Sequence, residues 1–219
     1  MTDEAAAGTD APAEVVVYGS PISNFVRTVR MVLIEKGIPY RLEPVAPQSA
    51  EIRAINPFGK IPAFRHGDLV LFESQAICRY IDDAFPGASL RPGDLAAKAL
   101  VDQWVGVGCD SADKACIRNY VLAYALPKWQ GREPDMEKVA AAVPAVQQVV
   151  TVIDQHLAGR DWIAGDGLTL ADLFLLPTLY LTSLYPEGKA IVADAPNLTR
   201  WLGTMTALPS FVATKPPRG

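Results

Sequence analysis

VVVYGSPISN, residues 15–24, is a β-branched run followed by a short turn that contains Gly and Pro. A β-branched run bounded by turn residues predicts a strand. From residue 24 to residue 36 apolar side chains recur at helical spacing, and Lys36-Gly37 is a typical helix end. The segment therefore predicts a strand, a tight turn and a helix whose first turn lies next to Ser23.

The same alternation of strands and helices continues to residue 85. Residues 39–45 predict a second strand, residues 63–64 and 69–72 a hairpin closed by residues 65–68, and residues 76–84 an amphipathic helix. The order β-α-β followed by β-β-α is that of a thioredoxin-like domain. We therefore expect an α/β, thioredoxin-like domain over residues 14–85.

The remainder of the chain has helical patterns only. A Pro- and Gly-rich linker, residues 86–94, separates it from the first domain. Helices are expected over residues 95–109, 112–124, 135–157, 169–184 and 197–207. Pro144 should kink the third of these or mark its true start. We expect an all-helical domain over residues 95–214, and a disordered tail over residues 1–13.

Composition excludes several function classes. The chain has 219 residues, half of them hydrophobic, and a net charge of -4, which gives no support for a nucleic-acid surface. It has no run of 18 uninterrupted apolar residues, so we expect no membrane span. Three cysteines without a C-x-x-C pair indicate reduced thiols and a cytoplasmic protein. Two distant histidines give no zinc pattern, and we expect no metal.

Ser23 is the first residue that points to chemistry. It lies at a predicted helix N-terminus, where unpaired N–H groups and a partial positive charge stabilise a thiolate. A hydroxyl that donates to the thiolate adds a charge-assisted hydrogen bond. Together the two effects could lower a thiol pKa by about two units. Ser23 as a simple helix cap is the other interpretation, and Ser20 is the competing hydroxyl.

A second candidate is the Ile61-Pro62 bond, just before a predicted strand. If this bond is cis, the backbone of Ile61 turns outward and can pair with an extended peptide ligand. An ordinary trans proline at a strand start is the alternative.

The third candidate is the pair Glu73-Ser74, at another predicted helix start. The serine and the helix N-terminus suit a carboxylate, and the neighbouring acid suits an ammonium group. The pair would fit the end of an α-amino acid. A helix cap beside a surface acid is the alternative.

In this order and spacing, the sequence resembles the glutathione S-transferase superfamily, in particular its serine-type branch near the phi and theta classes, in a bacterial style. The family's Gly-x-Pro-x-Ser matches residues 19–23, its Asn-Pro-x-Gly-x-[Val/Ile]-Pro matches residues 56–62, and its Glu-Ser pair matches residues 73–74. In the second domain, residues 162–172 resemble the start of the family's central helix. There Thr169 and Asp172 form a capping box that serves folding.

The resemblance implies that Ser23 donates a hydrogen bond to the thiolate of glutathione, the co-substrate, which attacks a small hydrophobic electrophile. It implies a homodimer and an electrophile pocket built from the serine loop and residues 104–120. The implied site residues fall into two sets. Glutathione would contact Ser23, Lys60, Ile61, Pro62, Glu73 and Ser74, and the electrophile Ile22, Trp104 and Ser111. Packing is the alternative role for Trp104 and Tyr120.

One departure from the family concerns the glycyl carboxylate of glutathione. Phi relatives contact it through a His-Lys pair, whereas Ala46 and Pro47 stand at that spacing here. Two other functions stay open at this point. One is a different glutathione-dependent reaction, such as peroxide reduction, dehalogenation, ether cleavage or isomerisation. The other is a glutathione-binding interaction module without catalysis.

Overall fold

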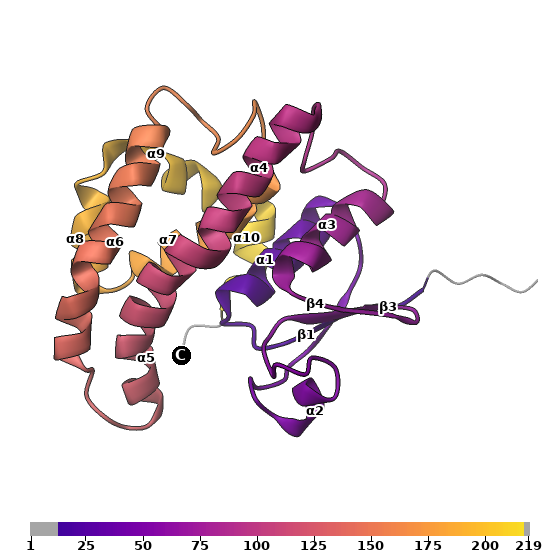
Figure 1. Cartoon of the computed structure of the whole chain (residues 1–219), viewed down its shortest axis with the longest axis horizontal. Coiled ribbons are helices and arrows are strands. Elements are labelled where there is room, and N and C mark those ends of the chain that lie inside the picture. Colours follow the sequence, from indigo (N-terminus) through magenta and orange to yellow (C-terminus); the bar gives the residue numbers. More distant parts are fainter. Residues whose placement is uncertain (1–12, 217–219) are drawn as a thin grey trace, which may run out of the picture.

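The computed structural model describes residues 13–216 and has two parts, a small sheet with flanking helices and a larger bundle of helices (Figure 1). Residues 1–12, which hold nearly all of the predicted disordered tail, lie outside the described residues, as do residues 217–219. The two parts meet where α1 (Asn24–Glu35) packs against α7 (Leu170–Thr182) and where Arg79 of α3 (Ser74–Ala84) pairs with Asp102 of α4 (Leu95–Val107).

The sheet has four strands: β1 (Val15–Tyr18), β2 (Arg41–Glu43), β3 (Ala63–His66) and β4 (Leu69–Phe72). Their order is β2-β1-β3-β4, with β1 and β2 parallel and the other pairs antiparallel. This mixed sheet and the order of its elements are those predicted from the sequence. The second strand is shorter than the predicted residues 39–45.

Helices cover both faces of the sheet. In Figure 1, α1 (Asn24–Glu35) and α3 (Ser74–Ala84) lie on the side of the helical part, and the single turn α2 (Ala50–Arg53) lies on the other. Val17, Val29, Phe64 and Ile77 are fully buried between the sheet and these helices. Apolar burial of this kind is the main force that holds such a layer together.

The helical part starts with one continuous helical rod. It consists of α4 (Leu95–Val107), the π-helical segment η1 (Gly108–Val121) and α5 (Leu122–Trp129). The prediction of two separate helices, 95–109 and 112–124, is therefore wrong. Gly108 does not break the helix; it lets α7 approach, because a Cβ atom there would lie 3.1 Å from Cβ of Phe174.

The helix α6 (Met136–His156) runs back along the rod, after a cap by the Asp135 side chain on the N–H of Lys138. Pro144 lies inside this helix and does not mark its start. By length and composition α6 could cross a membrane. It packs instead against η1, α8 and α9, as a helix of the bundle does.

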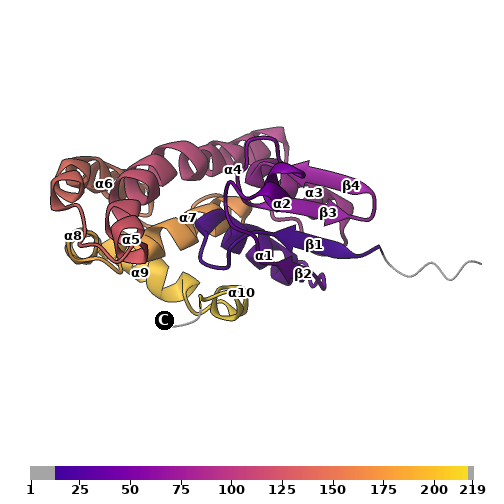
Figure 2. The same cartoon turned by 90° about the horizontal axis from the view of Figure 1, so that it is seen from below.

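The central helix is α7 (Leu170–Thr182), and nearly all of its residues are buried. Two short helices that the sequence did not predict, α8 (Pro186–Ala193) and α10 (Pro209–Ala213), flank α9 (Pro196–Met205). Each of the three begins with a proline, which is pre-organised for the first helical position. Figure 2 shows α10 beside α1, on the side opposite α4, so that α1 lies between two parts of the helical region.

The predicted linker is hydrogen-bonded to both regions of the fold. Lys36, at the end of α1, pairs with Asp82 of α3 at 3.3 Å, and both side chains are almost fully buried. Asp82 also accepts from the N–H of Leu90, and the carbonyl of Leu90 accepts from Leu170 N–H. The linker is thus part of the contact between the two regions.

Candidate functional site

The three predicted motifs meet at one edge of the sheet. Strand pairing aligns Tyr18 with Ala63, and Ala63 with Phe72. The loop after β1, the segment before β3 and the turn after β4 therefore leave the sheet side by side. These are residues 19–23, 60–62 and 73–74, so the register brings together residues that are up to 55 positions apart in sequence.

Ser23 is the N-cap of α1. Its hydroxyl oxygen accepts from the N–H of Val26 at 3.5 Å, and its side chain is only partly buried. Because the oxygen acts as acceptor for the helix, the hydroxyl hydrogen is free to donate to an anion at the helix N-terminus. The cap and the thiolate-donor roles, which were alternatives in the sequence, are therefore compatible in one geometry.

Ser20 lies in the turn before the helix. Its backbone carbonyl accepts from Ser23 N–H at 3.1 Å, which closes the turn and leaves Ser23, not Ser20, at the helix start. The helix dipole acts mainly within the first turn, so Ser23 has the stronger field.

The segment before β3 has the predicted cis peptide bond between Ile61 and Pro62. Asn56, which is 1% exposed, shapes this loop: its amide donates to the carbonyl of Lys60 at 2.9 Å and its side-chain oxygen accepts from Phe58 N–H at 3.0 Å. The side chain of Lys60 is exposed. The loop thus presents Ile61 and a cation at the same edge of the sheet.

Glu73 has a positive φ of 68°, which is unusual for a residue other than glycine. It is the N-cap residue of α3, makes no side-chain cap hydrogen bond, and is exposed. Such strained residues concentrate at functional sites, at a cost of about 1–3 kcal/mol each. Ser74 follows as the first helical residue and is 7% exposed.

The helical region contributes two residues of the expected stretch 104–120 that were not among the predicted site residues. The thiol of Cys109, on η1, lies near the Ser74 and Gln75 side chains. Burial raises the pKa of this thiol to about 11, so it stays protonated at neutral pH. One helical turn further along η1, Asp113 accepts from the amide of Asn24 at 3.0 Å. The four-residue spacing of Cys109 and Asp113 is the signal that could have indicated one shared face.

The predicted electrophile residues are not brought together. Ile22 is 40% exposed beside Ser23, as expected for a residue of the serine loop. Trp104 is buried and its ring centroid lies 4.2 Å from that of His156, with the rings tilted by 40°, so it packs in the helical core, the alternative role given above. Tyr120 is also fully buried.

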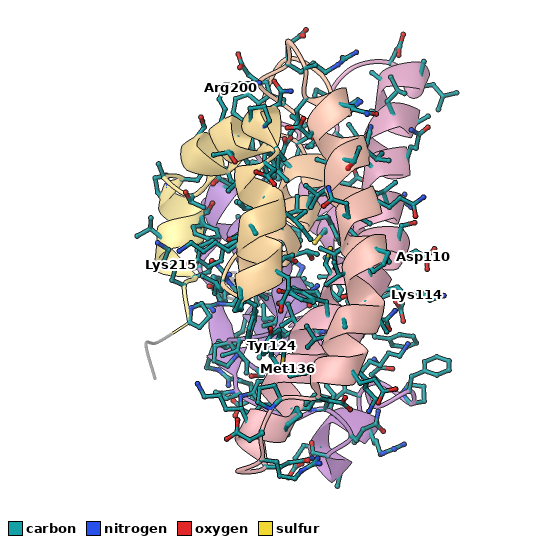
Figure 3. The ribbon with its side chains drawn as sticks, turned by 90° about the vertical axis from the view of Figure 1, so that its left-hand side faces the viewer. Asp110, Lys114, Tyr124, Met136, Arg200 and Lys215 are labelled. Atoms are coloured by element: carbon teal, nitrogen blue, oxygen red, sulfur yellow. The ribbon has the colours of Figure 1, made fainter. Side chains whose placement is uncertain are left out.

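Ser111 lies on a different face of η1. It lies two positions from both Cys109 and Asp113, about half a turn away, and lines a groove between η1 and α6 together with Lys114. In Figure 3, Lys114 projects outward from the bundle. Ser111 therefore belongs to the face turned away from α1, because helical phase, not sequence proximity, sets the direction of a side chain.

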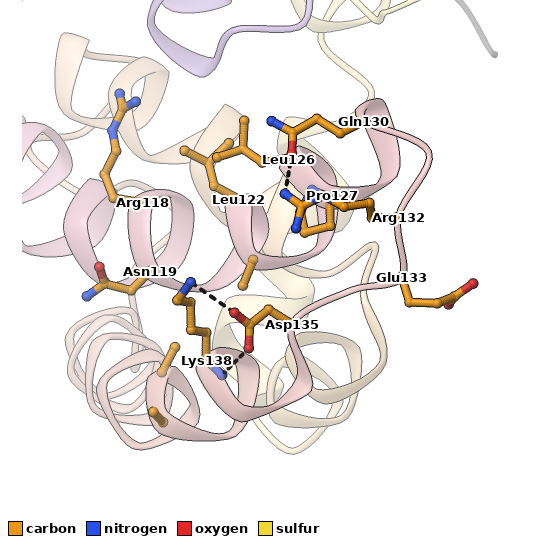
Figure 4. Close-up of a pocket in the computed structure, with 13 residues that line it drawn as sticks. Arg118, Asn119, Leu122, Leu126, Pro127, Gln130, Arg132, Glu133, Asp135 and Lys138 are labelled. Carbon is orange, nitrogen blue, oxygen red and sulfur yellow. Dashed lines mark hydrogen bonds and ion pairs between the residues drawn. The ribbon is translucent and has the colours of Figure 1, made fainter.

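A hollow with a volume of about 730 Å³ lies between α5 and α6. Arg118, Leu122 and Leu126 form one row of its lining, and the Asp135–Lys138 ion pair lies on the other side (Figure 4). Arg118 also donates to Asp113 at 2.8 Å, which connects one end of this groove to the start of α1. Within residues 13–216 no group of three or more His, Cys, Asp or Glu side chains is placed to hold a metal ion.

Two family models match the chain. The glutathione S-transferase N-terminal domain matches residues 17–89, and the glutathione S-transferase C-terminal domain matches residues 114–209. Together the two matches span both regions of the fold.

Similar proteins are found at moderate identity. Glutathione S-transferase 3 of Zea mays is 35% identical over 211 residues, which cover 92% of this chain and 93% of that protein. The apo structure of a glutathione S-transferase III superposes with a TM-score of 0.83 at 33% identity, over 94% of this chain and all of the other. Maize glutathione S-transferase I in complex with an atrazine glutathione conjugate gives 0.81 at 28% identity, over 93% of this chain and 96% of the other.

Proposed function

This chain belongs to the glutathione S-transferase family, and we propose that Ser23 activates the glutathione thiol at the start of α1. The activity is that of a glutathione transferase: a glutathione thiolate attacks an electrophilic carbon. The observation that supports the site is the convergence of residues 19–23, 60–62 and 73–74 at one edge of the sheet. Within the family, we infer membership of the serine-type branch near the phi and theta classes. The prediction that the protein is a bacterial-style member of this branch stays a prediction.

Glutathione would lie extended along this edge. Its thiolate would accept from the Ser23 hydroxyl, its cysteinyl backbone would pair with Ile61 next to Pro62, and its γ-glutamyl end would reach Glu73 and Ser74. The exposed carboxylate of Glu73 suits the ammonium group, and the start of α3 suits the carboxylate.

Lys60 is our candidate for the glycyl carboxylate, in place of the missing His-Lys pair. Gln48, the next residue after Ala46 and Pro47, is a weaker candidate for this contact because both ends of its side-chain amide already have partners. The amide donates to the carbonyl of Phe58, and the oxygen accepts from Arg53. Lys60 is exposed at the end of the same loop. Lys60→Gln should raise the KM for glutathione about tenfold, the loss expected for one charge-assisted contact, while kcat changes little.

The electrophile would lie along Ile22, Leu122 and Leu126. Leu126 is 44% exposed in the groove of Figure 4, and Ile22 is comparably exposed beside Ser23. Leu126→Ala should raise the KM for an apolar electrophile several-fold and leave the KM for glutathione unchanged. Leu100→Ala, another exposed leucine on the same rod, is the control that should change neither.

Ser23→Ala tests the mechanism directly. The ultraviolet absorbance of bound thiolate, followed against pH, should show the thiol pKa rise by about one to two units, since a hydrogen bond to a charge is worth about 1.5–3 kcal/mol. Turnover at pH 7 should fall 10- to 100-fold with nearly unchanged glutathione affinity. Ser20→Ala, in the same loop, is the matched control. Loss of turnover in Ser20→Ala but not in Ser23→Ala would mean that Ser20, and not Ser23, contacts the thiolate.

We also propose a homodimer. Both regions carry large exposed apolar side chains, among them Phe58 and Val70 near the sheet and Leu95 and Val152 on the helices. A second copy of the chain would cover such surfaces on both regions at once. Light scattering should give twice the chain mass of 23.6 kDa, and Val70→Glu should shift the protein toward the single-chain mass.

A cytoplasmic location remains our proposal as well. All three cysteines are free, which suits a reducing compartment. Cell fractionation with a soluble-enzyme marker is the test.

A further inference from the structure

A buried polar junction joins the residue after Ser23 to the helical region. Asn24, the first residue of α1, is 4% exposed. Its amide donates to the Asp113 carboxylate on η1 at 3.0 Å and to the Thr178 hydroxyl on α7 at 3.2 Å. The first turn of the helix that carries Ser23 is therefore positioned by contacts from outside its own domain.

This junction contains a buried negative charge. Asp113 is 7% exposed, and its second carboxylate oxygen accepts from Arg118 Nε at 2.8 Å. The Arg118 side chain is about half exposed, at 53%. The carboxylate thus faces a neutral amide on the side of α1 and a guanidinium on the side of the groove.

The other groups around Asp113 do not neutralise it. On η1, Cys109 and Cys116 both feel its charge, and each thiol has a pKa raised to about 11, chiefly by burial. Both thiols are therefore neutral at physiological pH. From α1 and α7, Asn24 and Thr178 contribute dipoles without net charge. Arg118 is the cation in direct contact with the carboxylate.

A bare carboxylate at this place would oppose catalysis. A negative charge near a second anion disfavours the charged form of that anion. The thiolate proposed at Ser23 forms one residue away from Asn24, in a partly buried region where charges are weakly screened. A carboxylate that holds Asn24 therefore needs a neutralising partner if it is not to oppose the thiolate.

We propose that Arg118 is a positioning residue for the transfer reaction: it neutralises Asp113, so that the carboxylate can hold Asn24 without opposing the thiolate. The inference rests on the proposed role of Ser23. In this view the hydrogen-bonded side chains of Asn24, Asp113 and Arg118 position the first turn of α1, and the guanidinium keeps the net charge beside it close to zero.

The test is the ultraviolet titration of thiolate in the glutathione-saturated enzyme. Arg118→Gln should raise the thiol pKa by about half a unit to one unit, because it leaves Asp113 uncompensated. Arg118→Lys, which keeps the charge, should restore most of the shift. In the double variant Asp113→Asn/Arg118→Gln the rise should disappear, since no charge remains to be neutralised.

A structural role alone would give a different pattern. Arg118→Gln and Arg118→Lys would then shift the pKa equally, or the double variant would add a further rise, and either result overturns the proposal. So does an unchanged pKa in Arg118→Gln when Ser23→Ala raises it. No rise in Ser23→Ala would instead overturn the proposed function. Arg118 is half exposed, so its single variants keep the test valid even if Asp113→Asn does not fold.

Discussion

Gly19 and Ile61 are in contact across the site. A Cβ atom built on Gly19 would lie 3.1 Å from Cβ of Ile61 and only 2.5 Å from Cγ2 of Val26. Gly19 also has a φ of 149°, in the region that favours glycine. The loop that carries Ser23 and the segment that carries the cis proline therefore approach each other through the missing side chain of one residue.

Gly19→Ala should separate these two segments. The added methyl group cannot be accommodated without movement of Val26 or Ile61, so the KM for glutathione should rise tenfold or more and the protein should lose stability. Gly37→Ala is the matched control: Gly37 has a φ of 68° but no atom within 4 Å of its built Cβ. It should lose stability and keep its KM. Equal KM values in the two variants would contradict the contact.

Asp172 should be critical for folding and not for chemistry. Its fully buried carboxylate accepts from the N–H of Ile163, from the N–H and hydroxyl of Thr169, and from the indole of Trp201. Asp172→Ala leaves these donors buried without partners and should lower the free energy of unfolding by about 3–5 kcal/mol. Urea unfolding measures this loss.

The control for Asp172→Ala is the exposed cap of another helix. Asp135→Ala also removes a side-chain cap, at the start of α6, but leaves its donors in contact with water. The free energy of unfolding should fall much less in Asp135→Ala than in Asp172→Ala. The thiol pKa of bound glutathione should be unchanged in both variants, and a shift in Asp172→Ala would mean that the capping box also supports the site.

Cys109 should report on the γ-glutamyl end of glutathione. Its thiol lies beside Ser74, and its pKa of about 11 makes alkylation slow at pH 8 and faster toward pH 10 and above. Saturating glutathione should slow the reaction with iodoacetamide further, as followed by mass spectrometry of the peptide. Cys78, which is fully buried, should stay unmodified in the native protein. An alkylation rate of Cys109 that does not change when glutathione is added would argue against Ser74 as a glutathione contact.

Alkaline pH should weaken the helical region through Tyr124. Its hydroxyl donates to Glu187 at 2.7 Å, and burial, together with that carboxylate, raises its pKa from 10 to about 12. A raised folded-state pKa gives stability that is complete below pH 10 and is lost as pH rises to 12. Urea midpoints between pH 9 and 12 should fall less steeply in Tyr124→Phe than in the unchanged protein. Parallel slopes would show that this tyrosine ionises equally in both states.

The local parts of the fold and of the glutathione site could be predicted from sequence. Strand, turn and helix signals around residues 15–24 depend on neighbouring residues only, and the structure places β1, the turn and α1 accordingly. The cis Ile61-Pro62 bond and the helix start at Ser74 agree with their short motifs. The helices α8 and α10 were missed because each is only a few residues long and carries little periodicity of its own.

The wall opposite Ser23 could not be predicted in the same way. Residues 104–120 were expected to supply it, and they do include Cys109 and Asp113, but Trp104 and Ser111 lie elsewhere. Both positions followed from the resemblance to the family, which gives a stretch of the chain and not the direction of each side chain. Trp104 packs on His156, and Ser111 lies about half a turn from Cys109 and Asp113, so each side chain faces another side of the rod.

The sequence by itself determined the order of the elements, the helix start at Ser23 and the three motifs of the candidate glutathione site, because each depends on a short segment and its chemistry. Only the tertiary structure decided which face of the long rod meets α1 and that Asp113, which pairs with Arg118, accepts from Asn24. Those contacts join residues 89 positions apart. They depend on helical phase and on how α1, η1 and α7 pack together, which no local pattern encodes.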